Sequence, residues 1–154
     1  MSYTEQLQAI VSEYQRAGEK WPATAREIAQ WAIHNRRWAP QPSVIVNQCA
    51  DELAKAMHDE YFTDPQGRRV RVKHAARYNE GVHQYVLWDD IRSAKPSHMK
   101  LAFQQRRQQI LGDCKQLKND IDSYNENGKP SEPVQMVYDF TLDLQEAELA
   151  KRRA

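Results

Sequence analysis

The residues with the clearest chemical potential in this sequence are cations that gather without acids. Residues 66–79 contain no Asp or Glu, yet they hold one histidine and five cations, which are Arg68, Arg69, Arg71, Lys73 and Arg77. Alternate residues of an extended strand point the same way and lie about 7 Å apart, so Arg69, Arg71 and Lys73 should share one face. Phosphates along a nucleic-acid strand have comparable spacing. The pattern predicts phosphate contact; the alternative is charge that protects an exposed strand edge.

Polar residues around the start of a predicted third helix form a second candidate set. Asn and Gln can bond an adenine edge through two hydrogen bonds, and Ser can reach a base or a phosphate. The residues in question are Gln41, Ser43, Asn47 and Gln48. The alternative is a helix cap followed by an ordinary solvated face. Just before them, Arg36 and Arg37 would either flank the phosphate backbone or complement the dipole of the preceding helix.

Side chains for catalysis or metal binding are scattered along the chain. The five histidines show no metal-ligand spacing with one another or with the cysteines, and there is no glycine-rich phosphate loop among the five glycines. Cys49 and Cys114 fall on apolar helical positions, which favours two buried, reduced thiols over a disulfide. We therefore expect no enzymatic activity, no cofactor and no metal.

Helical periodicity in the first sixty residues predicts three helices that would position these side chains. The first covers 4–17, and the second begins at a capping box in which Glu27 follows Thr24 by three residues. Prolines within 39–42 end the second helix, and Ser43 is the expected cap of the third, which ends near residue 59.

The next thirty residues have the composition of short strands. Strands are expected at 61–63, 69–73 and 82–88, with turn residues at 64–67 and a loop around 79–81. Three helices followed by strands predict an α+β fold.

The order of these elements resembles the winged helix-turn-helix superfamily. The resemblance covers roughly residues 4–92 and lies in the capped second helix (Thr24-Ala-Arg-Glu-Ile-Ala), the proline-containing turn, the third helix and the strand–turn–strand that bears cations. It implies that the start of the third helix enters a groove of nucleic acid while the β-hairpin, the wing, contacts the backbone.

A different pattern begins near Lys95, so we predict a winged-helix domain at 1–94 and a helical extension at 95–154. The extension should contain helices at 97–124 and 133–150. The first helix carries a seam of residues spaced by seven, four and three positions, with an interruption at Arg107. The members of this seam are Phe103, Ile110, Cys114, Leu117, Ile121 and Tyr124. This seam either pairs with a second chain or forms a hairpin with the last helix. The arginine and the short loop favour the hairpin, whereas symmetric DNA sites favour a dimer.

Composition places the protein among globular rather than membrane-spanning chains. Its 154 residues are 40% hydrophobic and 28% charged, and the formal net charge is only +1. No apolar run approaches a membrane span, and the start of the sequence shows no secretory signal, so cytoplasm is the expected compartment. The sequence predicts a nucleic-acid-binding protein, with DNA favoured over RNA, that serves as a transcription regulator or replication accessory factor. The alternative is a protein–protein interaction adaptor on the same scaffold.

Overall fold

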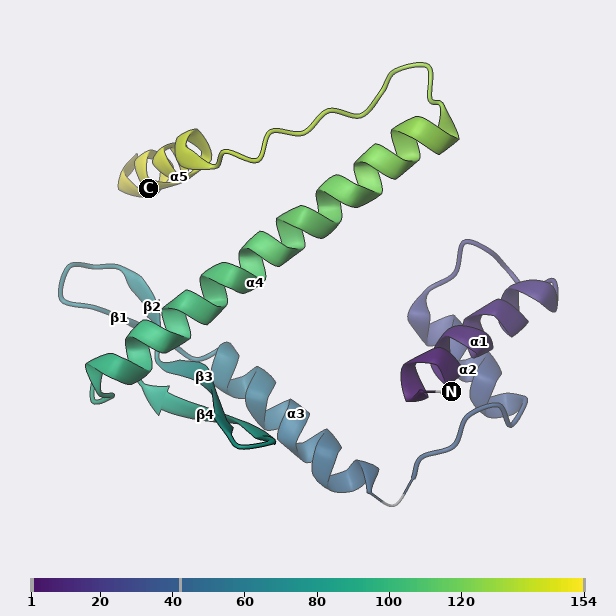
Figure 1. The fold of residues 1–154 in the computed structure, drawn as a ribbon, viewed down its shortest axis with the longest axis horizontal. Coiled ribbons are helices and arrows are strands. Elements are labelled where there is room, and N and C mark those ends of the chain that lie inside the picture. Colours follow the sequence, from purple (N-terminus) through teal and green to yellow (C-terminus); the bar gives the residue numbers. More distant parts are fainter. Residues whose placement is uncertain (1, 42, 154) are drawn as a thin grey trace. The chain divides into compact units, whose positions relative to one another are not determined.

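The computed structural model describes residues 2–41 and 43–153, and within them the fold is α+β, as predicted. Helices form the first part of the chain, two small antiparallel sheets follow, and a long helix comes next (Figure 1). The chain divides into two compact units, Met1–Ala56 and Met57–Ala154. The predicted division near residue 94 falls inside the second unit, because the long helix packs on a strand of that unit.

Helices α1 (Tyr3–Arg16) and α2 (Ala25–His34) pack together in the first unit. Tyr14 is buried between them, with its ring edge-on to Trp31 at a centroid distance of 5.5 Å. The Tyr14 hydroxyl donates a hydrogen bond of 2.9 Å to the Lys20 carbonyl, so the polar end of the ring is satisfied. Gly18 follows α1 at φ +74°, a conformation that glycine adopts without the strain of a Cβ. One aromatic side chain thus ties the two helices and their connection together.

The predicted capping box of α2 is confirmed. The Glu27 amide donates to the Thr24 hydroxyl at 3.1 Å, and the Thr24 amide donates to the Glu27 carboxylate at 2.7 Å. The pKa of Glu27 falls to about 2. The backbone hydrogen bond from Thr24 is the main cause, and the hydrogen bond from Lys20 is the next. Two amides at the start of α2 are therefore satisfied without tertiary contacts.

Replacing Thr24 tests the contribution of this cap. We expect Thr24→Ala to lower the free energy of unfolding by about 1 kcal/mol, since it removes the side-chain acceptor at the N-cap. Urea unfolding followed by tryptophan fluorescence measures the change. Thr4→Ala, an exposed threonine in the first turn of α1, is the control and should unfold like the wild type. Equal unfolding curves for the two variants would contradict the assignment.

Helix α3 (Val44–His58) is present as predicted, but it contributes nothing to a core. None of its side chains is buried. Cys49 is exposed, which corrects the prediction of a buried thiol there; both cysteines are free, and Cys114 is half-buried. The apolar positions of α3 are periodic, but periodicity alone does not supply a surface for them to cover.

Strands β1 (Tyr61–Thr63) and β2 (Arg69–Arg71) form the first hairpin of the second unit. The predicted turn at 64–67 connects them, with Gly67 at φ +84°. The Asp64 carboxylate accepts hydrogen bonds from the amides of Gln66 and Arg68, at 3.1 and 2.8 Å. An aspartate bonded to the backbone ahead of it is a standard way to close such a turn.

The predicted single strand at 69–73 is wrong, because the chain changes partner at Val72. That residue is only 2% exposed; its amide donates to the Glu60 carbonyl, and its carbonyl accepts from the Ile91 amide. Beyond it, β3 (Lys73–Glu80) pairs over its whole length with β4 (His83–Asp90). The expected loop around 79–81 is shorter than predicted, since Asn79 and Glu80 lie in β3. Gly81, at φ +61°, allows the tight turn.

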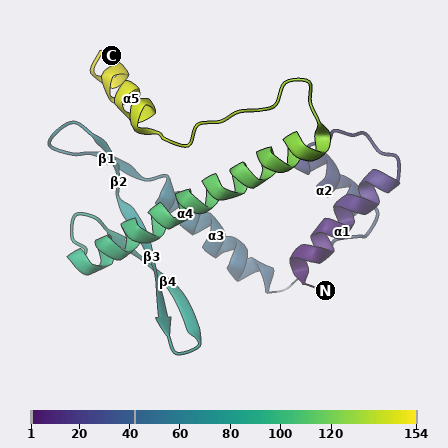
Figure 2. The same ribbon diagram turned by 45° about the horizontal axis from the view of Figure 1, so that its top comes forward.

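Helix α4 (Pro96–Ser123) packs against β3 and forms the core of the second unit, as the two ribbon views show (Figures 1 and 2). The buried side chains at this contact are His74, Ala76, His98, Met99 and Ala102. The π-helical turn η1 (Tyr124–Gly128) continues α4. Even with the length of α4, the described residues contain no helix apolar enough to cross a membrane.

The last helix, α5 (Thr141–Arg153), begins eight residues after the predicted start at 133. Two local interactions explain the delay. The Asn125 side chain bonds both the amide and the carbonyl of Val134, at 2.9 and 2.8 Å, which holds that backbone outside a helix. Asp139 then accepts from the amide and hydroxyl of Thr141, at 3.1 and 2.7 Å, which satisfies the first amide of α5. Among the described residues, α5 does not pack along α4 as a hairpin.

Candidate nucleic-acid interface

One face of the first hairpin carries two arginines around a tyrosine. Antiparallel pairing sets Tyr61 opposite Arg71 and Thr63 opposite Arg69, so these four side chains share a face, which we call the Arg–Tyr face. The guanidinium carbon lies 4.0 Å from the Tyr61 ring centroid for Arg69 and 6.0 Å for Arg71. The Arg71 Nε also donates to the Tyr61 hydroxyl at 3.4 Å. A single ring therefore orders two cations.

The charge of the Arg–Tyr face is not neutralised within the described chain. Neither Arg69 nor Arg71 forms an ion pair with a carboxylate there. The opposite face of the hairpin differs: Arg92 lies over the Phe62 ring at 5.0 Å, but it is paired with Asp90 at 2.8 Å. Because exposed Arg69 and half-buried Arg71 have no carboxylate partner in the described chain, their guanidinium groups are able to bind an anion without first breaking a salt bridge.

Two of the five predicted cations have internal partners, so the row of free cations is shorter than expected. Arg68 pairs with Asp64 at 2.8 Å, and Lys73 pairs with Glu60 at 3.2 Å. Backbone and side-chain hydrogen bonds from Arg68 lower the pKa of Asp64, so that carboxylate stays charged in the turn. Lys73 also belongs to β3 rather than to the strand of Arg69 and Arg71, which removes it from their shared face.

Arg77 and Lys151 are two further cations of the second unit. Arg77 is exposed on β3, and its amide and carbonyl are both bound by the Gln105 side chain, at 2.7 and 2.9 Å, which fixes the strand at that point. Lys151 of α5 lines a hollow beside the Arg–Tyr face together with Thr63 and Arg69. The sequence pattern did not place Lys151 or Tyr61 beside the basic run. Counting outward from the strand ends at Thr63 and Arg69 would have placed Tyr61 opposite Arg71.

The residues predicted to read bases at the start of α3 are exposed, but they differ in whether their side chains already have a hydrogen-bond partner. Ser43 and Asn47 are open to solvent, as a base-reading role needs. The Gln48 amide donates to Glu52 at 3.1 Å, so its side chain is partly engaged.

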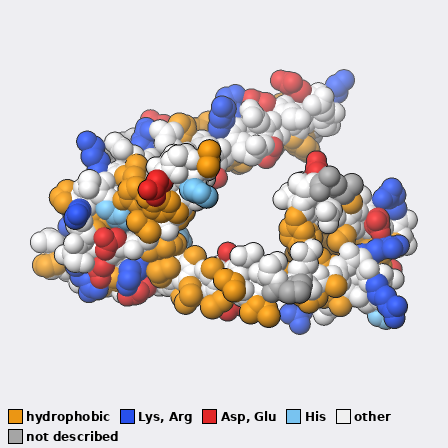
Figure 3. Space-filling view, turned by 60° about the horizontal axis from the view of Figure 1, so that its bottom comes forward, with side chains coloured by type: hydrophobic (Ala, Val, Ile, Leu, Met, Phe, Trp, Pro, Cys, Tyr) orange, Lys and Arg blue, Asp and Glu red, His pale blue; other side chains and the backbone are white. Residues whose placement is uncertain are grey.

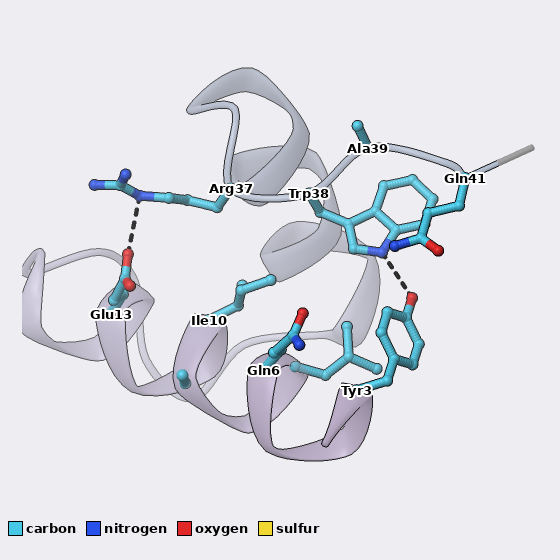
Figure 4. A pocket seen from close by; sticks show the side chains of 10 residues that line it. Tyr3, Gln6, Ile10, Glu13, Arg37, Trp38, Ala39 and Gln41 are labelled. Carbon is cyan, nitrogen blue, oxygen red and sulfur yellow. Dashed lines mark hydrogen bonds and ion pairs between the residues drawn. The ribbon is translucent and has the colours of Figure 1, made fainter. Parts of the chain in front are cut away.

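Arg36, Arg37 and Gln41 lie at the end of α2 and in the segment that follows it. Arg36 has a positive φ of 55°, and Arg37 pairs with Glu13 of α1 at 2.9 Å. That pair and the hydrogen bond from the Trp38 indole to the Tyr3 hydroxyl hold the segment against α1, where Gln41 lines a small pocket (Figure 4). Arg37 therefore forms an ion pair with Glu13, an interaction that neither of its two predicted roles included.

Sequence reasoning missed a buried pair of histidines between β3 and α4. His98 Nε2 lies 2.9 Å from the His74 carbonyl, which can only accept, so Nε2 carries the proton. Its Nδ1 then accepts from the Tyr78 hydroxyl at 2.8 Å. His74 Nε2 donates to the Arg71 carbonyl at 2.8 Å, and its ring meets Phe103 edge-on. The network connects the core to the strand that carries Arg71.

The burial of His74 predicts that stability depends on pH. Burial lowers the pKa of His74 because it disfavours the charged imidazolium, and nearby Arg106 adds to the effect. The unfolded chain binds a proton below about pH 6.5 while the folded chain resists it, so the free energy of unfolding should decrease as the pH falls below that value. Urea titrations on both sides of pH 6.5 measure this. His74→Leu should flatten the dependence, whereas the exposed control His83→Ala should preserve it.

A metal site needs several ligand side chains close together. The residues that the structure describes hold no group of three or more His, Cys, Asp or Glu side chains arranged to bind a metal. In comparisons with known proteins, no family, curated sequence or solved structure matches this chain.

Proposed function

We propose that the protein binds nucleic acid, with duplex DNA as the preferred form, through the Arg–Tyr face. The observation that carries the proposal is the pair of guanidinium groups that have no carboxylate partner among the described residues and are ordered on one ring at alternate strand positions. Their spacing of about 7 Å suits successive phosphates. Preordering by Tyr61 reduces the side-chain entropy lost on binding. The face supplies affinity for the backbone rather than sequence preference.

The exposed polar residues at the start of α3 are the proposed source of sequence preference. Ser43 and Asn47 remain accessible, and Asn can bond an adenine edge through two hydrogen bonds. The resemblance of the element order to the winged helix-turn-helix superfamily supports a role in transcription regulation or replication. A homodimer would suit such a role, because a two-fold symmetric protein matches a pseudo-palindromic site.

Fluorescence anisotropy with a labelled random-sequence duplex tests the proposal. Two phosphate contacts, one for each arginine of the Arg–Tyr face, predict a salt slope of about −1.8, so affinity should fall roughly 12-fold between about 50 and 200 mM salt. Unlabelled single-stranded DNA and duplex RNA serve as competitors and should displace the probe less well than duplex DNA. Absence of binding at the lower salt concentration would overturn the proposal, and better competition by RNA would overturn the DNA preference.

An adaptor that binds another protein is the second candidate, and exposed apolar side chains favour it. Those of α3 include Ile45, Val46 and Leu53, and hydrophobic side chains also reach solvent over much of the face in Figure 3. Binding of this kind would depend on Leu53 and respond weakly to salt, whereas binding through the Arg–Tyr face would show the reverse. Leu53→Ser and Arg69→Gln therefore separate the two candidates.

A further inference from the structure

Beyond its packing on β3, helix α4 carries an apolar stripe that the described chain leaves open. Ile110 is 53% exposed, Leu117 is 44% exposed and Tyr124 is 56% exposed. Among the described residues, the elements that α4 packs against most closely are β3 and the turn η1 that continues it. The buried positions against β3 are near its start, at His98, Met99 and Ala102. Beyond Ala102, the apolar side chains of α4 are exposed in the described structure, apart from the half-buried Cys114 and Ile121.

The stripe repeats every seven residues, as a coiled-coil seam does. Phe103, Ile110, Leu117 and Tyr124 occupy d positions, and the a positions between them are Arg107, Cys114 and Ile121. Gly112, whose missing side chain would weaken a seam, falls at the outward f position, with no heavy atom near where a Cβ would lie. At 3.6 residues per turn, Cys114 lies roughly 120° around the helix from Ala102, whereas Phe103, whose ring contacts His74 of β3, belongs to both the seam and the β3 contact.

From this we infer that α4 is a homodimerisation helix, which pairs in parallel and in register with α4 of a second copy through residues 103–124. Three heptads give a seam of about 33 Å. The sevenfold repeat specifies a helical partner with the same repeat, and this chain supplies one. Arg107 is the polar exception at an a position, and a single polar residue there fixes register and favours two strands, at a cost in stability.

The charges beside the seam decide between orientations. In a parallel pair each g position faces the e position of the next heptad on the other helix, which sets Asp113 against Lys118 of the second copy, twice by symmetry. No such contact in this register joins like charges, since Arg106 faces Leu111 and Asp120 faces Asn125. An antiparallel alignment of the same heptads would bring Asp113 against its own copy. Complementary charge therefore favours the parallel dimer.

Cysteine cross-linking of the full-length chain tests orientation and register. With Cys49 and Cys114 replaced by Ser, Arg107→Cys and Ile121→Cys are introduced one at a time at a positions two heptads apart. Both variants should form disulfide-linked dimers on mild oxidation, because each a residue meets its own copy in a parallel pair. Asn119→Cys, at an f position, is the matched control and should cross-link slowly. In an antiparallel pair at most one of the two a positions could meet itself, so efficient linkage at only one would overturn the parallel arrangement.

Charge reversal provides a second readout without cysteine. Asp113→Lys should raise the dissociation constant of the dimer about tenfold in sedimentation equilibrium, since two attractive pairs become repulsive. The double variant Asp113→Lys with Lys118→Asp should recover most of that loss. A wild-type chain that remains monomeric at every concentration would overturn the dimer, and dimerisation only after removal of residues 129–154 would show that the chain covers its own seam. None of these outcomes depends on nucleic-acid binding.

Discussion

Replacing both arginines of the Arg–Tyr face, as Arg69→Gln with Arg71→Gln, should weaken duplex binding roughly 100-fold at low salt, since each charge-assisted hydrogen bond contributes about 1.5 kcal/mol. The slope of log affinity against log salt should also become shallower by about 2, one for each lost phosphate contact. Anisotropy titrations at several salt concentrations measure both quantities. The fold should be unaffected, because neither arginine is buried or joined to a carboxylate within the described chain.

A matched pair of arginines in the first unit provides the control. Arg16→Gln with Arg26→Gln removes the same net charge from exposed positions on α1 and α2 that belong to neither candidate set. If the two double variants lose affinity equally, the attraction comes from overall charge, and the Arg–Tyr face has no special role. A separate Tyr61→Leu variant keeps both charges but removes the ring that orders them, so it should lose less affinity than the double arginine variant.

The largest effect on stability is expected at His98. His98→Ala should lower the free energy of unfolding by about 2 to 4 kcal/mol, because it removes two buried hydrogen bonds and leaves a cavity between α4 and β3. Tyr78→Phe, which removes only one of those bonds, should cost about 1 kcal/mol. Urea unfolding followed by Trp88 fluorescence reports on the second unit.

The exposed histidine His83 is the control for this experiment. His83 lies at the turn end of the hairpin formed by β3 and β4, and His83→Ala should leave stability nearly unchanged. A His98→Ala variant as stable as His83→Ala would show that the buried network does not hold α4 on β3. Combining His98→Ala with Tyr78→Phe should cost less than the sum of the single changes, since both remove the same hydrogen bond.

Local sequence signals predicted those parts of the fold that depend on interactions between residues close together in the sequence. The capping box at Thr24 and the turn closed by Asp64 use contacts within four residues, and the strand at 61–63 pairs with a strand only six to ten residues away. The strand predicted at 69–73 failed because alternation continues through Val72, although the strand partner changes there. Residue alternation reports which way a side chain points, but it carries no information about which strand is the neighbour.

The candidate site was predicted only in part, because several of its contacts join residues that are far apart in the sequence. The basic run was visible as composition, but the pairing of Lys73 with Glu60 depends on two residues thirteen positions apart that the bend at Val72 brings together. The network of His98, His74 and Tyr78 joins elements separated by twenty or more residues, so no short pattern reveals it. Helix α3 was predicted as an element, but the exposure of its apolar side depends on packing that no window of sequence describes.

NMR of ¹⁵N-labelled protein titrated with a short duplex tests the central claim most directly, because the arginine Nε–Hε signals report contact residue by residue. We predict that the signals of Arg69 and Arg71 shift on addition of DNA and broaden less as salt is added, while those of Arg16 and Arg26 stay in place. Unchanged signals from Arg69 and Arg71 in a sample that binds the duplex, or equal shifts at all four arginines, would contradict the account.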